Sequence, residues 1–365
     1  MSAVQAAKDL AATATSSITN LVNGAKLPQN QTILISGASG FVAAHVLNSF
    51  LQRGYNVRGT VRSEATAEKV KQTHSKYLKQ LSFAIVKDVA VPGAFDEAVK
   101  DVDGVVHTAS PFVMDVEDNE RDLLNPAVKG TTEILKAIKK NNPIVKRVVI
   151  TSSFAALVDL SQGTRVGYTY TEADWNPVTW DEAKTGPGGV AYCASKVFAE
   201  KAAYEFVEKE KPNFTISTIC PPMIYGPIAQ SVTDLSRLNT SAADIYRLFN
   251  GTTKEVPATE FPAYADVRDV GEAHVRAYES VGAAQQRYFI TGGNMSYREI
   301  CEIIREVPEV KEKVPQAAPG SKEPEVYKVS NAKATKELGM TFIPLRQCII
   351  DTVHSLLKVE QSVGK

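Results

Sequence analysis

The stretch Ile33-Leu-Ile-Ser-Gly-Ala-Ser-Gly-Phe-Val-Ala43 is an apolar run that ends at two closely spaced glycines and then resumes as an amphipathic segment. This pattern is typical of a buried β-strand, a tight turn that needs Gly37 and Gly40, and the start of a helix. In such a turn, backbone N–H groups and the positive end of the helix can approach a pyrophosphate. The motif alone fits a nucleotide site and an ordinary strand-to-helix turn equally well, because Ala43 replaces the third glycine of the simplest fingerprint.

Composition narrows the classes of function that the chain could serve. Its 365 residues are 44% hydrophobic and 22% charged, the balance of a globular protein with one large domain or a core and a smaller lobe. Lys plus Arg equals Asp plus Glu at 41 each, so we expect a small, weakly charged ligand and no nucleic acid or membrane partner. The four cysteines have no metal-like spacing, which predicts no metal site and a reducing compartment, the cytoplasm.

Residues 1–30 are a separate segment that carries no part of the functional argument. The first 26 residues are rich in Ala, Ser and Thr and contain no Arg, whereas a transit peptide is usually rich in Arg. We expect an N-terminal extension that is helical or disordered, either a helix docked on the surface or a frayed tail.

From residue 32 to residue 220, short β-branched runs alternate with longer amphipathic stretches. The runs predict strands at 32–36, 56–61, 82–87, 104–108, 147–152 and 214–219, and the stretches predict helices at 41–53, 65–80, 93–100, 118–140 and 191–211. Strands that are apolar on both faces and are joined by helices predict an α/β fold. We expect a Rossmann-type doubly wound parallel sheet with a smaller C-terminal substrate lobe.

The same alternation predicts how the chain divides. Residues 31–220 form the nucleotide-binding core and residues 264–292 return to it, while residues 221–263 and 293–365 form the substrate-binding lobe. Residues 155–190 read as one long irregular stretch, and a loop of that length in a compact domain is usually functional or disordered. We expect this stretch and the C-terminal lobe to roof the site.

Ligands bind outside the carboxyl ends of the strands in open α/β sheets, so the residues just after each strand are the candidates. Ser153 follows the fifth predicted strand, and Tyr192 and Lys196 open the next helix at a spacing that places both on one face. Tyr has a pKa near 10, so proton transfer near neutrality requires a decrease of about three units, part of which a nearby Lys charge supplies. A Ser/Thr cluster that only satisfies strand-end backbone groups, and a chance Tyr/Lys pair, are the alternatives.

Several motifs occur in the order found in one enzyme superfamily. They are Gly37-Ala-Ser-Gly-Phe-Val-Ala43, Thr151-Ser-Ser153, Tyr192-x-x-x-Lys196, Pro221-Pro-Met-Ile-Tyr-Gly-Pro227 and Asp266-Val-Arg-Asp269. From about residue 31 nearly to its end the chain resembles the extended short-chain dehydrogenase/reductases. Gly54-Tyr-Asn-Val-Arg-Gly-Thr-Val-Arg62 and Val105-Val-His-Thr-Ala-Ser-Pro111 make it similar to the dihydroflavonol-reductase-like group, especially fungal NADPH-dependent aldehyde and ketone reductases of the methylglyoxal type.

The resemblance implies the catalytic roles. Tyr192 would be the general acid in carbonyl reduction, Lys196 would lower its pKa and hold the nicotinamide ribose, and Ser153 would bind the carbonyl oxygen. Thr151 and Ser152 are expected to be structural, and His107 to be packed or hydrogen-bonded. Asp266 and Asp269 are expected to cap the start of a helix.

NADPH is the cofactor we expect. Arg62 stands at the end of the second strand, where an Arg suits a 2′-phosphate and an acid would suit NAD, although Glu64 nearby could still accept ribose hydroxyls. A solvated surface charge is the other interpretation of Arg62. The complete set of expected cofactor-binding residues is Gly37, Ser39, Gly40, Phe41, Val42, Arg62, Lys69, Asp88, Val89, Thr108, Ala109, Ser110, Tyr192, Lys196, Pro221 and Met223.

The expected reaction is reduction of an aldehyde or ketone, a small-molecule carbonyl substrate, by a monomer or homodimer. The expected substrate pocket consists of Phe112, Phe154, Met223 and Tyr225, although each of them could equally be core. Ala127 stands where many relatives have the Asn of a water relay, so a relay through Asn is not expected here. Two other functions stay open, a sugar-nucleotide epimerase or dehydratase on the same fold and a non-catalytic NADP-sensing protein.

Overall fold

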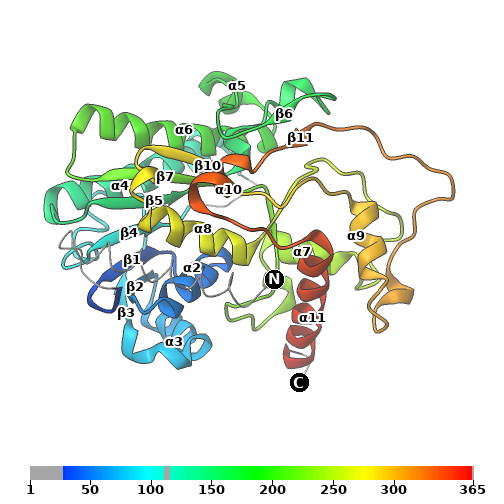
Figure 1. The fold of residues 1–365 in the computed structure, drawn as a ribbon, viewed down its shortest axis with the longest axis horizontal. Helices are drawn as coiled ribbons and strands as arrows, with labels where there is room; N and C mark the ends of the chain where they lie inside the picture. The colour runs from blue at the N-terminus through cyan, green and yellow to red at the C-terminus, as the bar shows by residue number, and fades with distance from the viewer. Residues whose placement is uncertain (1–27, 111–115, 364–365) are drawn as a thin grey trace, which may run out of the picture.

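A parallel sheet of seven strands forms the centre of the computed structural model, which describes residues 28–110 and 116–363 (Figure 1). The strand order is β10-β7-β5-β4-β1-β2-β3. The bounds are β1 Thr32–Ser36, β2 Asn56–Val61, β3 Leu81–Ile85, β4 Gly104–His107, β5 Arg147–Thr151, β7 Thr215–Cys220 and β10 Gln286–Phe289. The first six agree with the predicted strands to within two residues at each end. The predicted N-terminal extension lies, up to residue 27, outside the described residues.

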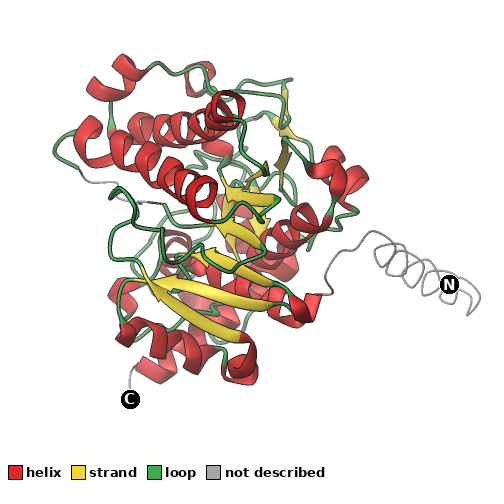
Figure 2. Cartoon of the chain, turned by 90° about the vertical axis from the view of Figure 1, so that its left-hand side faces the viewer, coloured by secondary structure: helices red, strands yellow, loops and turns green. Residues whose placement is uncertain are grey.

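Helices cover both faces of the sheet (Figure 2). The bounds are α2 Phe41–Gln52, α3 Glu64–Thr73, α4 Asn125–Asn141, α6 Gly188–Glu210, α8 Val267–Glu279 and α10 Ala332–Leu338. Ile33 and Ile35 pack in the same cluster as residues of α2 and α8, whereas Leu34 packs with residues of α4 and α6. Successive side chains of a strand point to opposite faces, so the apolar run Ile33–Ile35 contributes to the core on both sides of the sheet. The predicted doubly wound α/β fold is confirmed.

Three predicted helices differ from the structure. Residues 93–100 form consecutive turns instead of a helix, and Phe95, Ala98 and Val99 still reach the core from them. The helix predicted at 65–80 ends at Thr73 and continues as a 3-10 segment, because His74 leaves the helical conformation. The segment before α4 is a π turn, Glu120–Leu124, and Pro126 just after it has no N–H to give the α-helical hydrogen bond.

A second, smaller core lies beside the sheet, at the right of Figure 1. It joins α7 Thr240–Arg247, α9 Tyr297–Ile304 and α11 Leu345–Val363 to the two-stranded sheet of β8 Met223–Tyr225 and β9 Tyr264–Asp266. The division of the chain into a core and a substrate lobe at the predicted boundaries stays a prediction.

The stretch 155–190 has more structure than its sequence indicated. It contains β6 Thr169–Tyr170, which pairs with β11 Lys328–Val329, and α5 Trp180–Thr185, which begins with a capping box at Thr179. The remaining short helical turns of the described chain are η1 Pro28–Asn30, η2 Ser75–Gln80, η3 Glu120–Leu124, η4 Phe154–Ala156, η5 Leu160–Gln162, η6 Leu235–Arg237, η7 Val281–Ala283 and η8 Lys311–Lys313.

Candidate active site

The glycine turn between β1 and α2 is held in a tight, specific conformation. Gly37 has a φ of +69°, and a Cβ there would lie 3.1 Å from the Cβ of Ala109. Its N–H donates to the hydroxyl of Thr60 at 3.0 Å, and the N–H of Ala38 donates to the carbonyl of Thr60 at 2.9 Å. Gly40 has ordinary extended dihedrals, so only Gly37 needs a positive φ. A Cβ on Gly40 would lie 3.3 Å from the carbonyl oxygen of Gly37, so its glycine requirement is one of space.

The end of β4 is fastened to the same turn by Ser36. Its hydroxyl accepts hydrogen bonds from the N–H groups of Thr108 and Ala109, both at 3.0 Å, and contacts Nδ1 of His107 at 2.9 Å. His107 is buried, and burial followed by the charge of Lys196 lowers its pKa to about 4. A neutral, buried His107 therefore has a structural role. The segment Thr108–Ser110 thus lies against the start of α2, where an expected dinucleotide would bind.

The three expected catalytic residues come together at the ends of β5 and β4 and the start of α6. Ser153 caps the turn η4 after β5 and is hydrogen-bonded to the phenol of Tyr192 on α6. Nζ of Lys196 lies 5.3 Å from the ring centroid of Tyr192 and donates to the hydroxyl of Ser110 at 2.7 Å. The spacing of four residues places both side chains on one face of the helix, as the sequence predicts.

The acid–base state of this cluster differs from the expectation. Burial raises the pKa of Tyr192 to about 12, and the hydrogen bond from Ser153 opposes this only in part. Burial lowers the pKa of Lys196 to about 8. The expected fall in the pKa of Tyr192 is therefore wrong for this structure, because desolvation by burial is the largest effect on this phenol. A phenol with a raised pKa is fully protonated at neutral pH, which is the form that gives a proton.

Two basic residues lie at the other end of the glycine turn. Arg62 follows β2 and is exposed, and Lys69 is exposed on α3, whose first residue is the exposed Glu64. Lys69 lines a small pocket together with Ser39, Thr66 and Gln230. Because Gln230 comes from the segment after β8, that segment reaches the turn, which the sequence did not indicate. The side-chain oxygen of Gln230 is buried there with no hydrogen-bond partner among the described residues.

Asp88 and Val89 lie three and four residues after the end of β3. Oδ1 of Asp88, which is exposed, accepts a hydrogen bond from the N–H of Ala90 at 2.9 Å, the geometry of a turn former. Val89 is half-buried against α4, where a Cβ on Gly130 would lie 3.1 Å from its methyl group. The turn at Asp88 leaves its other carboxylate oxygen available to a ligand.

The expected substrate-pocket residues do not form one wall. Phe154 is 2% exposed and stacks on Phe289 with ring centroids 4.9 Å apart, and Tyr225 is 1% exposed with its hydroxyl donating to Asp244 at 2.9 Å. Both are core residues here, which corrects their assignment as pocket lining. Met223 is half-buried and stays a candidate, and Phe112 lies outside the described residues.

The other expectations at this rim have separate outcomes. Asp266 caps α8 by accepting from the N–H of Arg268, as expected, but Asp269 accepts from the N–H of Ile343 and is not a cap. Pro221 is buried just after β7. Within residues 28–110 and 116–363, no helix is both long and apolar enough to cross a membrane, and no three His, Cys, Asp or Glu side chains gather as a metal site would need.

The site's residues fit a dinucleotide on structural grounds. The first turn of α2 presents its N–H groups beside the glycine turn, where Gly37 packs so closely against Ala109 that a Cβ would be crowded. Exposed Arg62 and Lys69 lie near this turn. Ser110 and Lys196 are joined at the far end, next to Tyr192. The arrangement can therefore hold a dinucleotide between a basic end and an end that carries a protonated phenol.

Comparisons with known proteins agree with this geometry. Residues 33–291 match the NAD dependent epimerase/dehydratase family. A putative NADPH-dependent methylglyoxal reductase of Candida albicans is 38% identical over 346 residues, 91% of this chain and 100% of the relative. A ketoreductase of Aspergillus niger is 41% identical over 334 residues, 89% of this chain and 97% of the relative.

Solved structures show the same relationship. The crystal structure of yeast methylglyoxal/isovaleraldehyde reductase complexed with NADPH superposes with a TM-score of 0.81 at 35% identity, covering 90% of this chain and 99% of the yeast chain. Together with the family match, this similarity gives the assignment. The chain belongs to the NAD dependent epimerase/dehydratase family, the extended short-chain dehydrogenase/reductases.

Proposed function

We propose that the chain catalyses the NADPH-dependent reduction of a small aldehyde or ketone to an alcohol. The observation that carries the proposal is the hydrogen bond between Ser153 and Tyr192 with Lys196 beside them, at the rim where the glycine turn begins α2. The relatives named above as methylglyoxal reductases and a ketoreductase support the same reaction class.

Each residue has a defined task in this proposal. When bound, the nicotinamide cofactor supplies a hydride to the carbonyl carbon. Ser153 donates a hydrogen bond to the carbonyl oxygen and orients it toward Tyr192. The hydroxyl of Tyr192 gives its proton to that oxygen as negative charge develops there. The ammonium of Lys196 stabilises the phenolate that remains and holds the ribose hydroxyls.

The remaining cofactor contacts follow from position. Ser39, Phe41 and Val42 bind the pyrophosphate with backbone N–H groups at the start of α2, and Gly37 and Gly40 form the tight turn that lets it approach. Arg62 and Lys69 bind the 2′-phosphate, since a guanidinium donates two parallel hydrogen bonds to a phosphate. Asp88 and Val89 meet the adenine, and Thr108, Ala109, Ser110, Pro221 and Met223 lie along the rest of the cofactor.

The proposal also covers the cellular location of the protein and the place where the substrate binds. The four cysteines are free and buried, which supports a reducing, cytoplasmic location. We also place the substrate between the core at 31–220 and a lobe at 221–263 and 293–365, in a monomer or homodimer. The sugar-nucleotide alternative is less favoured, because buried Phe154, Ala155 and Ala156 follow Ser153 where a dehydratase tends to have acids.

The test is loss of NADPH absorbance against a panel of small aldehydes, diketones and flavanonols. The proposal expects turnover with at least one carbonyl compound and slower turnover with NADH. NADPH binding without turnover on any of the panel would favour a cofactor-sensing protein. Conversion of a sugar nucleotide without net NADPH consumption would favour an epimerase.

A further inference from the structure

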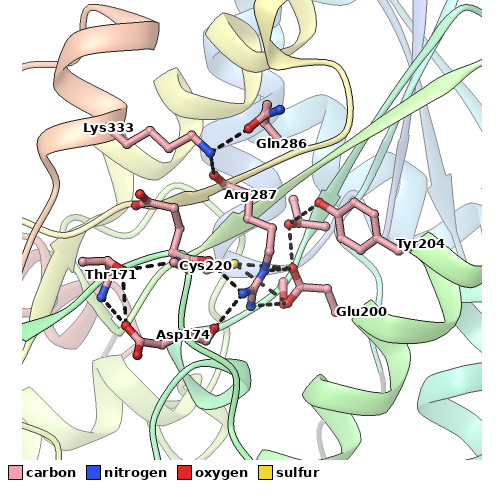
Figure 3. Close-up of polar contacts among 12 residues, drawn as sticks. Thr171, Asp174, Glu200, Tyr204, Cys220, Gln286, Arg287 and Lys333 are labelled. Carbon is pink, nitrogen blue, oxygen red and sulfur yellow. Dashed lines mark hydrogen bonds and ion pairs between the residues drawn. The ribbon is translucent and has the colours of Figure 1, made fainter.

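A buried ion pair lies directly behind the proposed catalytic residues. Glu200 on α6 is 2% exposed and Arg287 on β10 is 9% exposed. Nε of Arg287 lies 2.7 Å from Oε1 of Glu200, and Nη2 of Arg287 lies 3.2 Å from Oε2 (Figure 3). Burying two charges costs free energy that one ion pair rarely recovers in full, so such a pair often serves something other than stability.

The carboxylate of Glu200 connects the strand end to the catalytic helix. Its Oε2 accepts a hydrogen bond from the hydroxyl of Ser152 at 2.6 Å, and Ser152 is the residue before Ser153. Glu200 lies one helical turn beyond Lys196 and two beyond Tyr192 on the same side of α6. One carboxylate therefore joins the backbone that carries Ser153 to the helix that carries Tyr192.

The other carboxylate oxygen is anchored within the sheet. Oε1 of Glu200 accepts from the hydroxyl of Thr218 on β7 at 2.6 Å, and the hydroxyl of Thr218 contacts that of Tyr204 at 3.1 Å. Figure 3 shows Tyr204 and Glu200 both projecting from α6 toward this point. The carboxylate thus has contacts on β7, on β10 and at Ser152 just after β5.

Arg287 extends the connection to the stretch 155–190. Its guanidinium donates to the carbonyls of Glu172 and Asp174 at 2.8 and 2.7 Å, and it stacks on the ring of Trp175 at 3.6 Å. Asp174 in turn accepts from the N–H of Thr171 at 2.7 Å, which closes this turn (Figure 3). Arg287 therefore fastens the expected roof of the site to the pair.

We propose that Glu200 and Arg287 are positioning residues: Glu200 sets the separation of Ser153 and Tyr192, and Arg287 holds the turn 171–175 over the substrate. The proposal rests on the proposed carbonyl reduction. In the proposed reaction, neither the Glu200 nor the Arg287 side chain touches the substrate. Both act through the groups that they hold, and a small displacement of a proton donor is enough to reduce the rate strongly.

The first test removes one link and leaves the pair intact. Ser152→Ala deletes the bond from the strand end, whereas Thr218→Val deletes one bond to the same carboxylate from a strand that carries no catalytic group. We expect Ser152→Ala to lower kcat by about tenfold to a hundredfold with the KM for NADPH unchanged, and Thr218→Val to lower it much less. Equal effects of the two variants, or none from Ser152→Ala, would overturn the proposal.

The second test separates the two partners. Arg287→Lys keeps a charge for Glu200 but cannot hold two carbonyls and stack on Trp175. We expect it to raise the KM for the carbonyl substrate more than it lowers kcat. Glu200→Gln keeps the shape and should lower kcat instead. A common loss in both variants that merely follows their melting temperatures would mean a structural role alone.

A distant variant provides the matched stability control. Asn142 is buried near the amino ends of β4 and β5, whereas Ser153 follows the carboxyl end of β5, and it donates to the carbonyls of Val99 and Val102 at 2.7 and 2.8 Å. Asn142→Ala should lower the melting temperature and leave kcat and the pH profile unchanged. If it lowers kcat as much as Ser152→Ala does, the effect of Ser152 is general destabilisation and the proposal fails.

Crystal structures of wild type and Ser152→Ala give a readout that needs no turnover. We expect the hydrogen bond between Ser153 and Tyr192 to be lost or lengthened in the variant. Its retention would overturn the positioning role. A wild-type protein with this geometry that reduces no carbonyl compound would instead overturn the proposed function, so the two failures are distinguishable.

Discussion

The two ends of the proposed cofactor site differ in how far water reaches them. Ser153, Tyr192 and Lys196 are half-buried. Burial raises the pKa of Tyr192 and lowers that of Lys196, and both changes favour the neutral form of the side chain. Arg62 and Lys69 at the opposite end are exposed. The difference suggests a division of labour, because a buried donor can set the rate of proton transfer while exposed cations select the cofactor by charge.

The largest expected effect is at the buried end. Tyr192→Phe removes the proton donor and should lower kcat by about 10²–10⁴-fold, the usual contribution of a general acid. Binding of NADPH, measured by fluorescence titration, should change little. Tyr246→Phe is the control, since Tyr246 belongs to the smaller core, where its hydroxyl on α7 donates to Glu360 on α11 at 2.8 Å. Full activity of Tyr192→Phe would remove the assigned acid.

The pH profile tests the charge of Lys196. Its pKa is lowered to about 8, so the ammonium is present below that pH and is lost as the pH rises through it, while Tyr192 stays protonated until about pH 12. We expect kcat/KM for reduction to fall by up to about tenfold per pH unit above 8. Lys196→Arg keeps its charge, so this limb should vanish in that variant. A wild-type profile that is level up to about pH 10 would contradict the assignment.

At the exposed end, Arg62→Ala should change cofactor choice and leave the chemical step intact. We expect the KM for NADPH to rise by about tenfold to a hundredfold, the loss of hydrogen bonds to a charged group, while the KM for NADH stays nearly constant. Steady-state kinetics with both cofactors measures this. Equal increases for the two would assign Arg62 to the solvated surface.

The smallest effect should come from Lys69, which is one exposed charge on a helix. Lys69→Ala should raise the KM for NADPH by about twofold to fivefold, and added salt should reduce the difference from wild type. Lys71→Ala is the matched control on the same helix, because Lys71 is paired with Glu68 at 2.6 Å. If the two variants behave alike, Lys69 is not a phosphate ligand.

At the buried end of the site, the sequence predicts the strands and the positions of the catalytic residues better than it predicts their contacts and pKa values. The strands β1, β4 and β5 have apolar residues on both faces, and such runs are typical of a parallel sheet covered on both sides. β10 does not follow this rule because its Gln286 and Arg287 are polar. The partners of Arg287 are Glu200, 87 residues away in the sequence, and the carbonyls of Glu172 and Asp174, 115 and 113 residues away. Contacts of that separation have no local signal.

The errors in side-chain assignment have a common cause. Apolar character predicts that Phe154 and Tyr225 are buried, but it does not say whether a core or a ligand buries them, and here the core does. The pKa of Tyr192 differs from the prediction because the sequence places Lys196 nearby but does not show how deeply the phenol is buried. Residues 93–100 have apolar residues at the spacing of a helix, but they bury these residues from consecutive turns and form no helix.

Transfer of label from cofactor to product tests the reductase account most directly. Wild-type protein would be incubated with a carbonyl substrate and NADPH in which both hydrogens on the reactive carbon of the nicotinamide ring are deuterium. The alcohol would then be analysed by mass spectrometry. The account predicts an alcohol with one deuterium on the former carbonyl carbon. An alcohol without deuterium, or labelled NADPH consumed with no alcohol formed, would contradict it.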